Sequence, residues 1–402
     1  MVLEDVCELI ADCPHTTAPD EGKGYPLIRT PNVGKGRLLL EGVHRVSKDI
    51  YDKRNMRAIP QKDDIIFARE APAGNAALIR EGQEVCLGQR TVLIRPDCEK
   101  VFPKYLVYYL LAPEQQYKLL GTANGATVAH VNLPVIRKMP IELPDIDVQQ
   151  KIAGYISIYD DLIENNQKQI KLLEEAAQRL YKEWFIDLRF PGYENCKIVD
   201  GVPEGWSFVQ LGDVLEKITT GLNPRKNFVL GNGNNYYVTI KNMRDNNIYL
   251  DDRCDKVDDE ALEKINKRSD LRIGDILFSG IGTMGRVYLI SIPTDNWNVS
   301  ESVFTMRANH RISKELLYLM LLSDDVQNYC DLNAHGVAQR GIRMADLKAY
   351  KFKLPNQEII DNFTSIVTPI LIRVQKLQKE NLCLQESRDR LLPKLMSGEI
   401  EV

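Results

Sequence analysis

The strongest hydrophobic pattern in the chain is a seam of apolar residues that occurs twice, from Val148 to Phe185 and from Glu358 to Met396. Its positions alternate in steps of four and three, the spacing of a helix that pairs with another helix. The seam positions are 152, 156, 159, 163, 166, 170, 173, 177, 180 and 184, and then 363, 367, 370, 374, 377, 381, 384, 388, 391 and 395. A helix that covers its own domain core also carries an apolar stripe, but ten positions in two copies favour helix pairing.

Each seam predicts one long helix, and about thirty-eight helical residues span roughly 57 Å. Pro369 and Pro393 lie inside the second seam. Because proline has no backbone N–H and its ring clashes with the preceding turn, they predict a kink or a late start of that helix.

Outside the seams the pattern changes to short strands separated by turns rich in glycine and proline. The predicted elements of the first half are strands at Tyr25–Thr30, Asp64–Ala68, Ala76–Ile79 and Arg90–Ile94, and a helix at Pro103–Leu120. Those of the second half are strands at Tyr236–Ile240, Asp275–Ser279, Val287–Ile290 and Ser302–Met306, and a helix at Ser313–Tyr329. Each half is expected to close with a strand that ends in Leu-Pro, at 143–144 and at 354–355. The segment Asp187–Trp206 reads as a loop.

The two halves are copies of each other. Asp64-Ile65-Ile66-Phe67 returns as Asp275-Ile276-Leu277-Phe278, and 275 − 64 = 211. Such a repeat predicts an α+β protein with two related α/β domains and two long antiparallel coiled-coil helices that separate them. The expected boundaries are a first head at 1–144, a first long helix at 145–190, a linker with the second head at 191–355, and a second long helix at 356–402.

Composition narrows the class of protein. The net charge of −4 gives no bulk attraction to nucleic acid, so DNA binding would need local basic clusters or a basic partner. The eight cysteines form no CxxC pair, which predicts free thiols in a cytoplasmic protein without a metal site. No apolar run is long enough to span a membrane, and the N-terminus does not read as a signal peptide.

No known catalytic motif stands out. Gly280-Ile281-Gly282-Thr283-Met284-Gly285 fits the glycine pattern of dinucleotide-binding loops. That pattern requires a helix to follow, whereas Val287–Ile290 reads as a strand, so we interpret the glycines as a hairpin loop. There is no P-loop, no HExxH and no (Asn/Asp)-Pro-Pro-(Tyr/Phe) methyltransferase tetrapeptide. The chain therefore looks like a binding protein, with no catalytic residue or cofactor of its own.

Several segments resemble the specificity (S) subunits of type I restriction–modification systems. The helix end Leu173–Phe185 resembles the family's central conserved helix, as do Phe190-Pro191-Gly192 and Gly201–Trp206 after it. The ending Leu391–Ile400 is similar to that of the family, and Gly125–His130 with Leu133–Pro144 resembles the tail of its target-recognition domains.

The resemblance implies a DNA-binding subunit without catalytic activity. Two target-recognition domains would each read half of a bipartite double-stranded DNA site, and the long helices would hold them apart. Two methyltransferase subunits carrying S-adenosylmethionine would dock on the helices, and restriction subunits would join them. Two other readings stay open: a stand-alone DNA methyltransferase with a split recognition region, which binding of S-adenosylmethionine would reveal, and a bivalent adaptor for proteins or RNA, which a shift assay with duplex DNA would separate.

Residues that read DNA are expected among basic and amide side chains on loops near the strands. The candidates are Arg29, Asn32, Lys35, Arg37, Arg69, Asn75, Gln89, Arg90 and His130 in the first head, and Lys241, Asn242, Arg244, Arg286, Gln339, Arg340 and Arg343 in the second. Any one of them alone could be a solvated surface residue; together they predict an enriched surface. Asn32 corresponds to Asn242 and Asn75 to Arg286, whereas Asp64 and Asp275 are expected to cap turns.

The seams also predict a register. Facing positions of an antiparallel pair have a constant sum, and each seam holds one asparagine, so pairing Asn166 with Asn381 gives 166 + 381 = 547. That sum places Tyr159 opposite Arg388 in a cation–π contact. Apolar residues beside the seams could pack on the heads or meet a methyltransferase helix: Tyr155, Leu162, Leu172, Ala176, Ile366, Leu371, Leu382 and Leu392.

Overall fold

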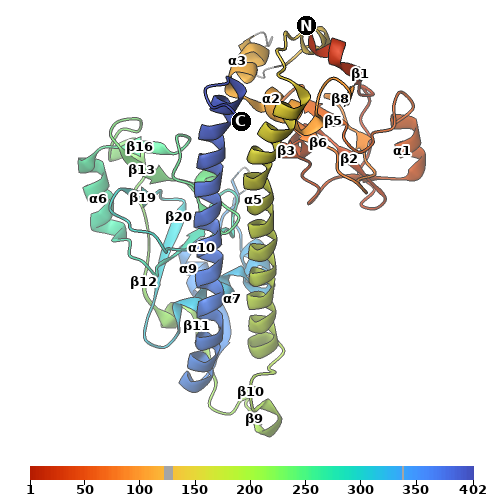
Figure 1. Ribbon diagram of the computed structural model, residues 1–402. Coiled ribbons are helices and arrows are strands. Elements are labelled where there is room, and N and C mark those ends of the chain that lie inside the picture. The colour runs from red at the N-terminus through yellow and green to blue at the C-terminus, as the bar shows by residue number, and fades with distance from the viewer. Residues whose placement is uncertain (122–129, 337–338) are drawn as a thin grey trace. The chain divides into compact units, whose positions relative to one another are not determined.

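The computed structural model describes residues 1–121, 130–336 and 339–402. The chain forms two compact units, one of residues 1–165 with 380–402 and one of residues 166–379 (Figure 1). Each unit contains one head and a part of both long helices. The stretch Gly125–Ala129 of the family-like motif lies outside the described residues.

The first unit is built on a five-stranded sheet in the order β1-β8-β5-β6-β3. Its strands are β1 (Cys7–Asp12), β8 (Thr91–Pro96), β5 (Ile65–Ala68), β6 (Ala76–Leu78) and β3 (Gly36–Arg37). A smaller sheet holds β4 (Arg45–Val46), β2 (Tyr25–Ile28) and β7 (Cys86–Leu87). The short helices are η1 (Leu3–Val6), η2 (Thr30–Asn32), α1 (Lys48–Arg54), α2 (Pro103–Leu111), α3 (Pro113–Gly121) and α4 (Leu133–Arg137).

The central strand β5 shows why this sheet is buried on both faces. Ile65 and Phe67 point into a core shared with α2 and the long helices, while Ile66 and Ala68 point into a second core. All four residues of β5 are fully buried, so it reads as a continuous apolar run rather than an alternating one.

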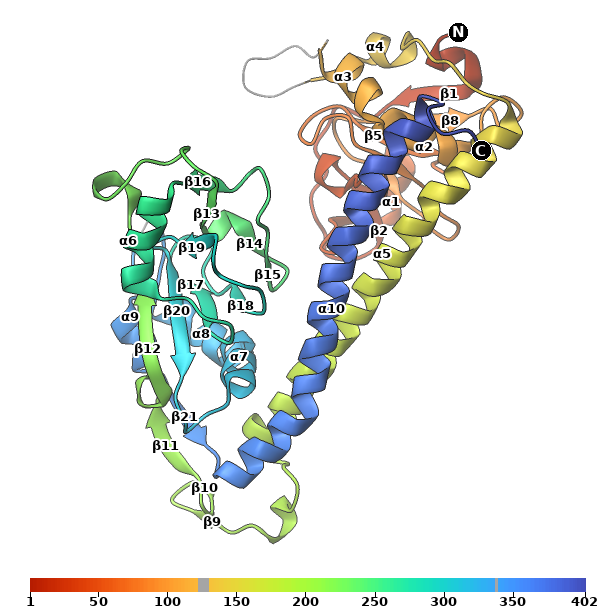
Figure 2. The same ribbon diagram turned by 60° about the vertical axis from the view of Figure 1, so that its left-hand side comes forward.

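The second unit repeats this plan with a sheet in the order β12-β20-β17-β18. Its strands are β12 (Leu215–Thr220), β20 (Val303–Ala308), β17 (Ile276–Ser279) and β18 (Val287–Leu289), and the smaller sheet holds β16 (Asp255–Val257), β13 (Asn235–Val238) and β19 (Trp297–Val299). Two-stranded pairs are β11 (Ser207–Gln210) with β21 (Lys351–Leu354), β14 (Met243–Arg244) with β15 (Asn247–Ile248), and β9 (Ile198–Val199) with β10 (Val202–Pro203). The helices are η3 (Lys182–Ile186), η4 (Tyr193–Asn195), η5 (Leu211–Val214), η6 (Pro224–Lys226), η7 (Ile240–Asn242), α6 (Asp259–Ser269), α7 (Lys314–Leu322), α8 (Asp324–Leu332) and α9 (Met344–Lys348). In Figure 2, α6 covers the smaller sheet and α7 lies against the larger one.

Equivalent hydrogen bonds confirm that the heads are copies. The backbone N–H of Gln61 donates to Asp64 Oδ2 at 3.0 Å, and that of Arg272 donates to Asp275 Oδ2 at 2.9 Å. The prediction that both aspartates cap a turn is therefore confirmed. Each also forms a buried ion pair with an arginine of the neighbouring strand, Asp64 with Arg95 at 2.8 Å and Asp275 with Arg307 at 2.7 Å.

Four local predictions were wrong. The helices predicted at Pro103–Leu120 and Ser313–Tyr329 are each two helices, broken at Ala112 and Ser323, whose backbones are extended. At Ala112 the cause is Pro113, since a residue before proline avoids the helical conformation. Among the described residues of the first head no strand ends at 143–144; an isolated bridge joins Val2 and Pro140 just before this point. The segment Asp187–Trp206 contains the β9–β10 hairpin as well as loop.

The predicted long helices are α5 (Ile146–Tyr181) and α10 (Gln357–Met396). α10 begins at Gln357 and continues through Pro369 and Pro393, so the expectation of a late start was wrong. Each proline removes a single N–H, and buried seam residues such as Phe363, Val367 and Leu395 offset that loss.

The two helices are antiparallel. In the second unit Phe363 lies 5.6 Å from Trp184 between ring centroids, and Arg373, ten residues further on, donates to Gln169 Oε1 at 3.3 Å. Higher numbers on α10 thus meet lower numbers on α5, and the predicted fold class is confirmed. Within the described ranges, no helix is long and apolar enough to cross a membrane.

Candidate nucleic-acid interface

Two of the candidate asparagines are part of the framework of the heads. Asn32 and Asn242 are both buried, and each accepts a hydrogen bond from the backbone N–H three residues earlier, of Arg29 at 3.1 Å and of Thr239 at 2.9 Å. Each thereby caps a short 3-10 turn, η2 or η7. In the structure as it stands, these side chains point into the protein.

Asn75 and Arg286 also share one structural role. Asn75 Nδ2 donates to the carbonyl of Val33 at 2.8 Å, and Arg286 donates to the carbonyls of Ile240 and Met243. Val33 and Met243 directly follow the two equivalent turns. Different side chains at this repeat position therefore hold the same loop in place.

The remaining candidates divide by exposure. The exposed ones are Lys35, Arg90, Lys241, Gln339, Arg340 and Arg343. The half-buried ones are Arg29, Arg37, Gln89, Arg244 and His130. The guanidinium of Arg244 stacks on the ring of Tyr249 at 4.0 Å, and Arg37 lies 3.9 Å from Glu164 on α5. The exposed group supplies five cations and the Gln339 amide for contacts with a nucleic-acid backbone or base edge.

In the first head, four candidates converge where β1 and β5 end and β8 begins. The side chain of Arg69 is buried and binds both carboxylate oxygens of Asp12, at 3.0 and 3.1 Å, and the carbonyl of Val131 at 2.9 Å. Its remaining amino group lies 3.0 Å from His130 Nε2. Gln89 belongs to the same end of the sheet, where its amide donates to the carbonyl of His15.

The network continues outward through a carboxylate. His130 Nδ1 lies 2.8 Å from Glu70 Oε1, and Arg90 forms an ion pair with Glu70 Oε2. Because Arg69 can only donate, His130 Nε2 accepts, and Nδ1 carries the proton that binds Glu70. Burial, followed by the charges of Arg69 and Arg90, lowers the pKa of His130 below its ordinary value, in agreement with a neutral imidazole.

The second head carries different residues at this place. Equivalent backbone bonds, from Arg69 N to Arg90 O and from Gly280 N to Ser302 O, align Arg69 with Gly280 and Arg90 with Ser302. A bond from Val131 N to Arg69 O likewise matches one from Ile342 N to Gly280 O, which aligns His130 with Gly341. A Cβ on Gly280 would lie 2.5 Å from the Phe304 ring, so a side chain has no room there.

The glycine-rich stretch of the second head forms a hairpin loop. Residues 280–285 join β17 to β18, which pair antiparallel from Ile276 with Leu289 to Phe278 with Val287. The sequence interpretation of this stretch as a loop between strands is confirmed, since no helix starts after the glycines.

The polar residues of the helix seams behave differently from one another. Asn166 and Asn381 are both buried, and Asn166 Nδ2 and Asn381 Oδ1 have no hydrogen-bond partner among the described residues. Their pairing stays a prediction. Arg388 forms a charge-assisted bond with Asp160 at 2.6 Å, and its contact with the neighbouring Tyr159 stays a prediction.

Asp160 joins three elements of the first unit. It accepts from Arg388 on α10 and from the Tyr108 hydroxyl on α2 at 2.7 Å. Sequence reasoning missed Asp160 and Tyr108. The signal for a buried carboxylate partner was the arginine at an apolar seam position.

The apolar residues beside the seams divide into two groups. Leu371 and Leu392 are buried in the cores of the second and first unit. The exposed residues are Tyr155, Leu162, Leu172, Ile366 and Leu382. Tyr155 is 52% exposed and Ile366 is 44% exposed. Tyr155 and Ile366 occupy equivalent positions of the repeat, since 366 − 155 = 211.

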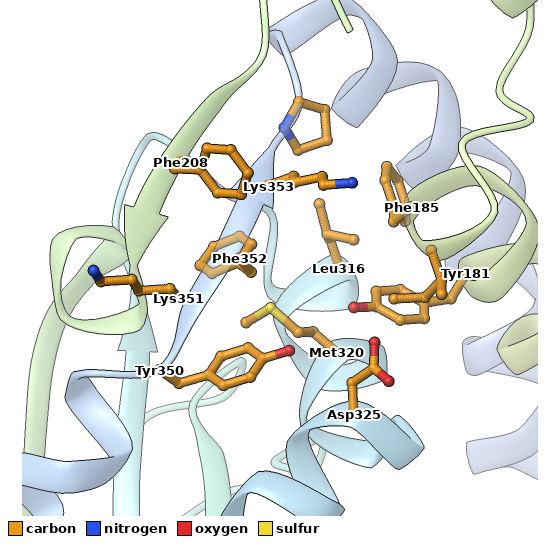
Figure 3. Close-up of a pocket in the computed structure, with 12 residues that line it drawn as sticks. Tyr181, Phe185, Phe208, Leu316, Met320, Asp325, Tyr350, Lys351, Phe352 and Lys353 are labelled. Carbon is orange, nitrogen blue, oxygen red and sulfur yellow. The ribbon is translucent and has the colours of Figure 1, made fainter. Parts of the chain in front are cut away.

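The second unit also has an aromatic cavity of about 280 Å³ (Figure 3). Phe208 and Phe352 on the β11–β21 pair lie on one side, and Tyr181 and Phe185 at the end of the first long helix lie on the other. None of the candidate DNA-binding residues lines it, so this cavity is separate from the candidate interface.

Comparison with known proteins identifies the class. Residues 1–175 and 203–381 match the family described as the type I restriction modification DNA specificity domain, and the chain belongs to this family.

Individual relatives cover most of the chain. It is 25% identical to the type I restriction enzyme MjaIX specificity subunit of Methanocaldococcus jannaschii over 90% of this chain and 83% of that protein. It is 24% identical to the HindI specificity subunit of Haemophilus influenzae over 85% of this chain and 87% of that protein. The crystal structure of a type I restriction–modification S subunit from M. genitalium has the same fold, with a TM-score of 0.57 at 16% identity over 98% of this chain and 95% of that one.

Proposed function

We propose that the chain is the non-catalytic specificity subunit of a type I restriction–modification complex, and that its heads read two different halves of one asymmetric, bipartite double-stranded DNA site. The observation that carries the proposal is the contrast between a repeated framework and a changed polar surface. Asn32 and Asn242 perform the same structural task, whereas Arg69 and His130 are replaced by Gly280 and Gly341. Related scaffolds with unlike polar groups suit two readers of unlike sequences.

The exposed flank of the long helices supports two equivalent docking sites for methyltransferase subunits. Tyr155 and Ile366 are large apolar residues that remain exposed at the same repeat position, one in each unit. An exposed apolar stripe on a helix is a typical surface for a partner helix. In this proposal the methyltransferase subunits carry S-adenosylmethionine, and restriction subunits join the resulting complex.

A binding assay tests the proposal directly. Because this chain has a net charge of −4, its affinity for duplex DNA should be weak when it is alone. Addition of the cognate methyltransferase subunit should tighten binding by at least tenfold and steepen its salt dependence, measured by fluorescence anisotropy between about 50 and 200 mM salt. Equal affinity with and without that subunit would contradict the proposal.

The double variant Tyr155→Asp/Ile366→Asp should prevent the methyltransferase from assembling on the chain, as measured by size-exclusion chromatography. Asp161→Ala, at another exposed position of α5, is the control and should leave assembly unchanged. Normal assembly of the double variant would rule out these two residues as the docking surface.

A further inference from the structure

The network at the end of the first sheet leads to one exposed cation. Arg69 is buried, and four of its five N–H donors are engaged by Asp12, Val131 and His130. Arg90 lies at the other end of the chain of contacts, and its side chain is 60% exposed. Its ion-pair partner is Glu70, whose own side chain is 14% exposed.

The backbone at Arg90 is also unusual. Its φ of +64° is in the left-handed region, which costs free energy for a residue with a side chain, and Ser302 at the equivalent place of the second head does not share it. Such conformations persist where the surrounding structure imposes them, and they gather at functional sites. Here the backbone N–H of Arg90 donates to Cys13 Sγ at 3.0 Å, and its carbonyl accepts from Arg69 N at 2.9 Å, so both polar groups of the strained residue are fixed.

We propose that Arg90, held by Glu70, is the guanine-reading residue of the first head, and that Asp12, Arg69 and His130 position this pair. The inference rests on the proposed function. A guanidinium presents two parallel donors that match the O6 and N7 acceptors of guanine in the major groove. A carboxylate behind the guanidinium fixes its plane before DNA arrives, which reduces the rotamer entropy lost on binding.

The repeat supplies an internal comparison. At the equivalent site the second head has Ser302, Ile281, Gly280 and Gly341, which cannot form this network. The half-site read by the first head therefore contains a guanine. The second head has no arginine at the equivalent position to read a guanine in the same way.

The test is selection from a DNA library randomised in both half-sites, with the complex of full-length chain and cognate methyltransferase. Arg90→Ala should lower the preference for guanine at one position of one half-site by roughly 5- to 150-fold and leave the other half-site unchanged. Arg90→Lys should lose most of the same preference, because an ammonium cannot bind both acceptors in a fork. Glu70→Gln should weaken it at the same position.

Arg80→Ala is the matched control, since Arg80 is an exposed arginine of the same head whose side chain is bound to Glu164 at 2.6 Å. It should leave all base preferences unchanged, and thermal unfolding and methyltransferase assembly confirm that each variant is folded. Unchanged base preference in Arg90→Ala, or a uniform loss for all sequences, would overturn the inference. A wild-type complex without any base preference would overturn the proposed function itself.

Discussion

Asp275 and Arg307 link the neighbouring strands β17 and β20 inside the second head, as Asp64 and Arg95 link β5 and β8 in the first. Asp275 is 1% exposed, and its carboxylate also holds the N–H of Arg272. A buried pair of this kind is expensive to break, because the surviving charge loses its partner without regaining water.

Replacing Asp275 with alanine should therefore destabilise the second unit by about 3–5 kcal/mol. Urea unfolding followed by tryptophan fluorescence measures this, because Trp184, Trp206 and Trp297 are the three tryptophans of the chain and all lie in that unit. Glu263→Ala breaks the exposed pair with Lys267 and should change stability by no more than about 0.5 kcal/mol. A similar loss of unfolding free energy in both variants would show that the buried Asp275 pair contributes no more to stability than an exposed ion pair.

Glu174 gives a prediction about pH. Burial raises the pKa of its carboxyl above the ordinary 4.5, although a hydrogen bond from Asn246 opposes the change. The folded protein then binds this proton more tightly than the unfolded chain does, so this contribution to stability is complete below pH 4.5 and is lost as the pH rises through the folded pKa.

Glu174→Gln removes that titration while keeping an acceptor for Asn246. Relative to wild type, the variant should gain stability as the pH rises above 4.5 and keep the gain at neutral pH. Glu175→Gln, at the exposed neighbouring position, is the control in the same unfolding experiment. A Glu174→Gln effect that is independent of pH would refute this assignment.

At single positions the sequence showed which side chains could bind DNA, but it did not show which of them hold the backbone of the heads in place. Asn32, Asn75, Asn242 and Arg286 look like surface readers of DNA in a sequence, yet their hydrogen bonds hold backbone turns. One signal was available, because an asparagine that is identical at equivalent positions of two related heads is well explained by a shared framework role. The caps at Asp64 and Asp275 were predictable, since capping depends on local spacing.

At the scale of elements, the seam predicted both long helices because its periodicity is repeated over many turns. The breaks at Ala112 and Ser323 were missed, although the apolar runs end there, before Pro113 and before Asp324-Asp325. The short helices α1 and α6 were missed as well, because polar and charged residues dominate both.

The two buried seam asparagines yield a prediction for α5 and α10. Asn166 Nδ2 and Asn381 Oδ1 are buried and have no hydrogen-bond partner within the described part of the chain, and such a group costs about 1–3 kcal/mol. The double variant Asn166→Leu/Asn381→Leu should therefore raise the melting temperature followed by helical circular dichroism, while loosening the helix register. Asn165→Leu, at an exposed position of α5, is the control and should not stabilise the protein. A lower melting temperature in the double variant would mean that these amides are satisfied in the folded protein.

At the scale of the whole molecule, the repeat of 211 residues predicted two heads and two helices, and the family comparison agrees with that plan. The chemistry that distinguishes the heads could not be predicted in the same way. Arg69 and Glu70 follow β5, Arg90 precedes β8, and His130 comes from a distant segment. The four residues form a network only when β1, β5 and β8 bring these segments together.

The most direct test of the account is a map of methylated adenines in DNA treated with the complex of this chain, its cognate methyltransferase and S-adenosylmethionine. Two heads with one framework and unlike polar residues should produce a single motif made of two different half-sites with a fixed gap between them. A continuous palindrome, or methylation without sequence preference, would contradict the claim that each head reads its own half of one bipartite site.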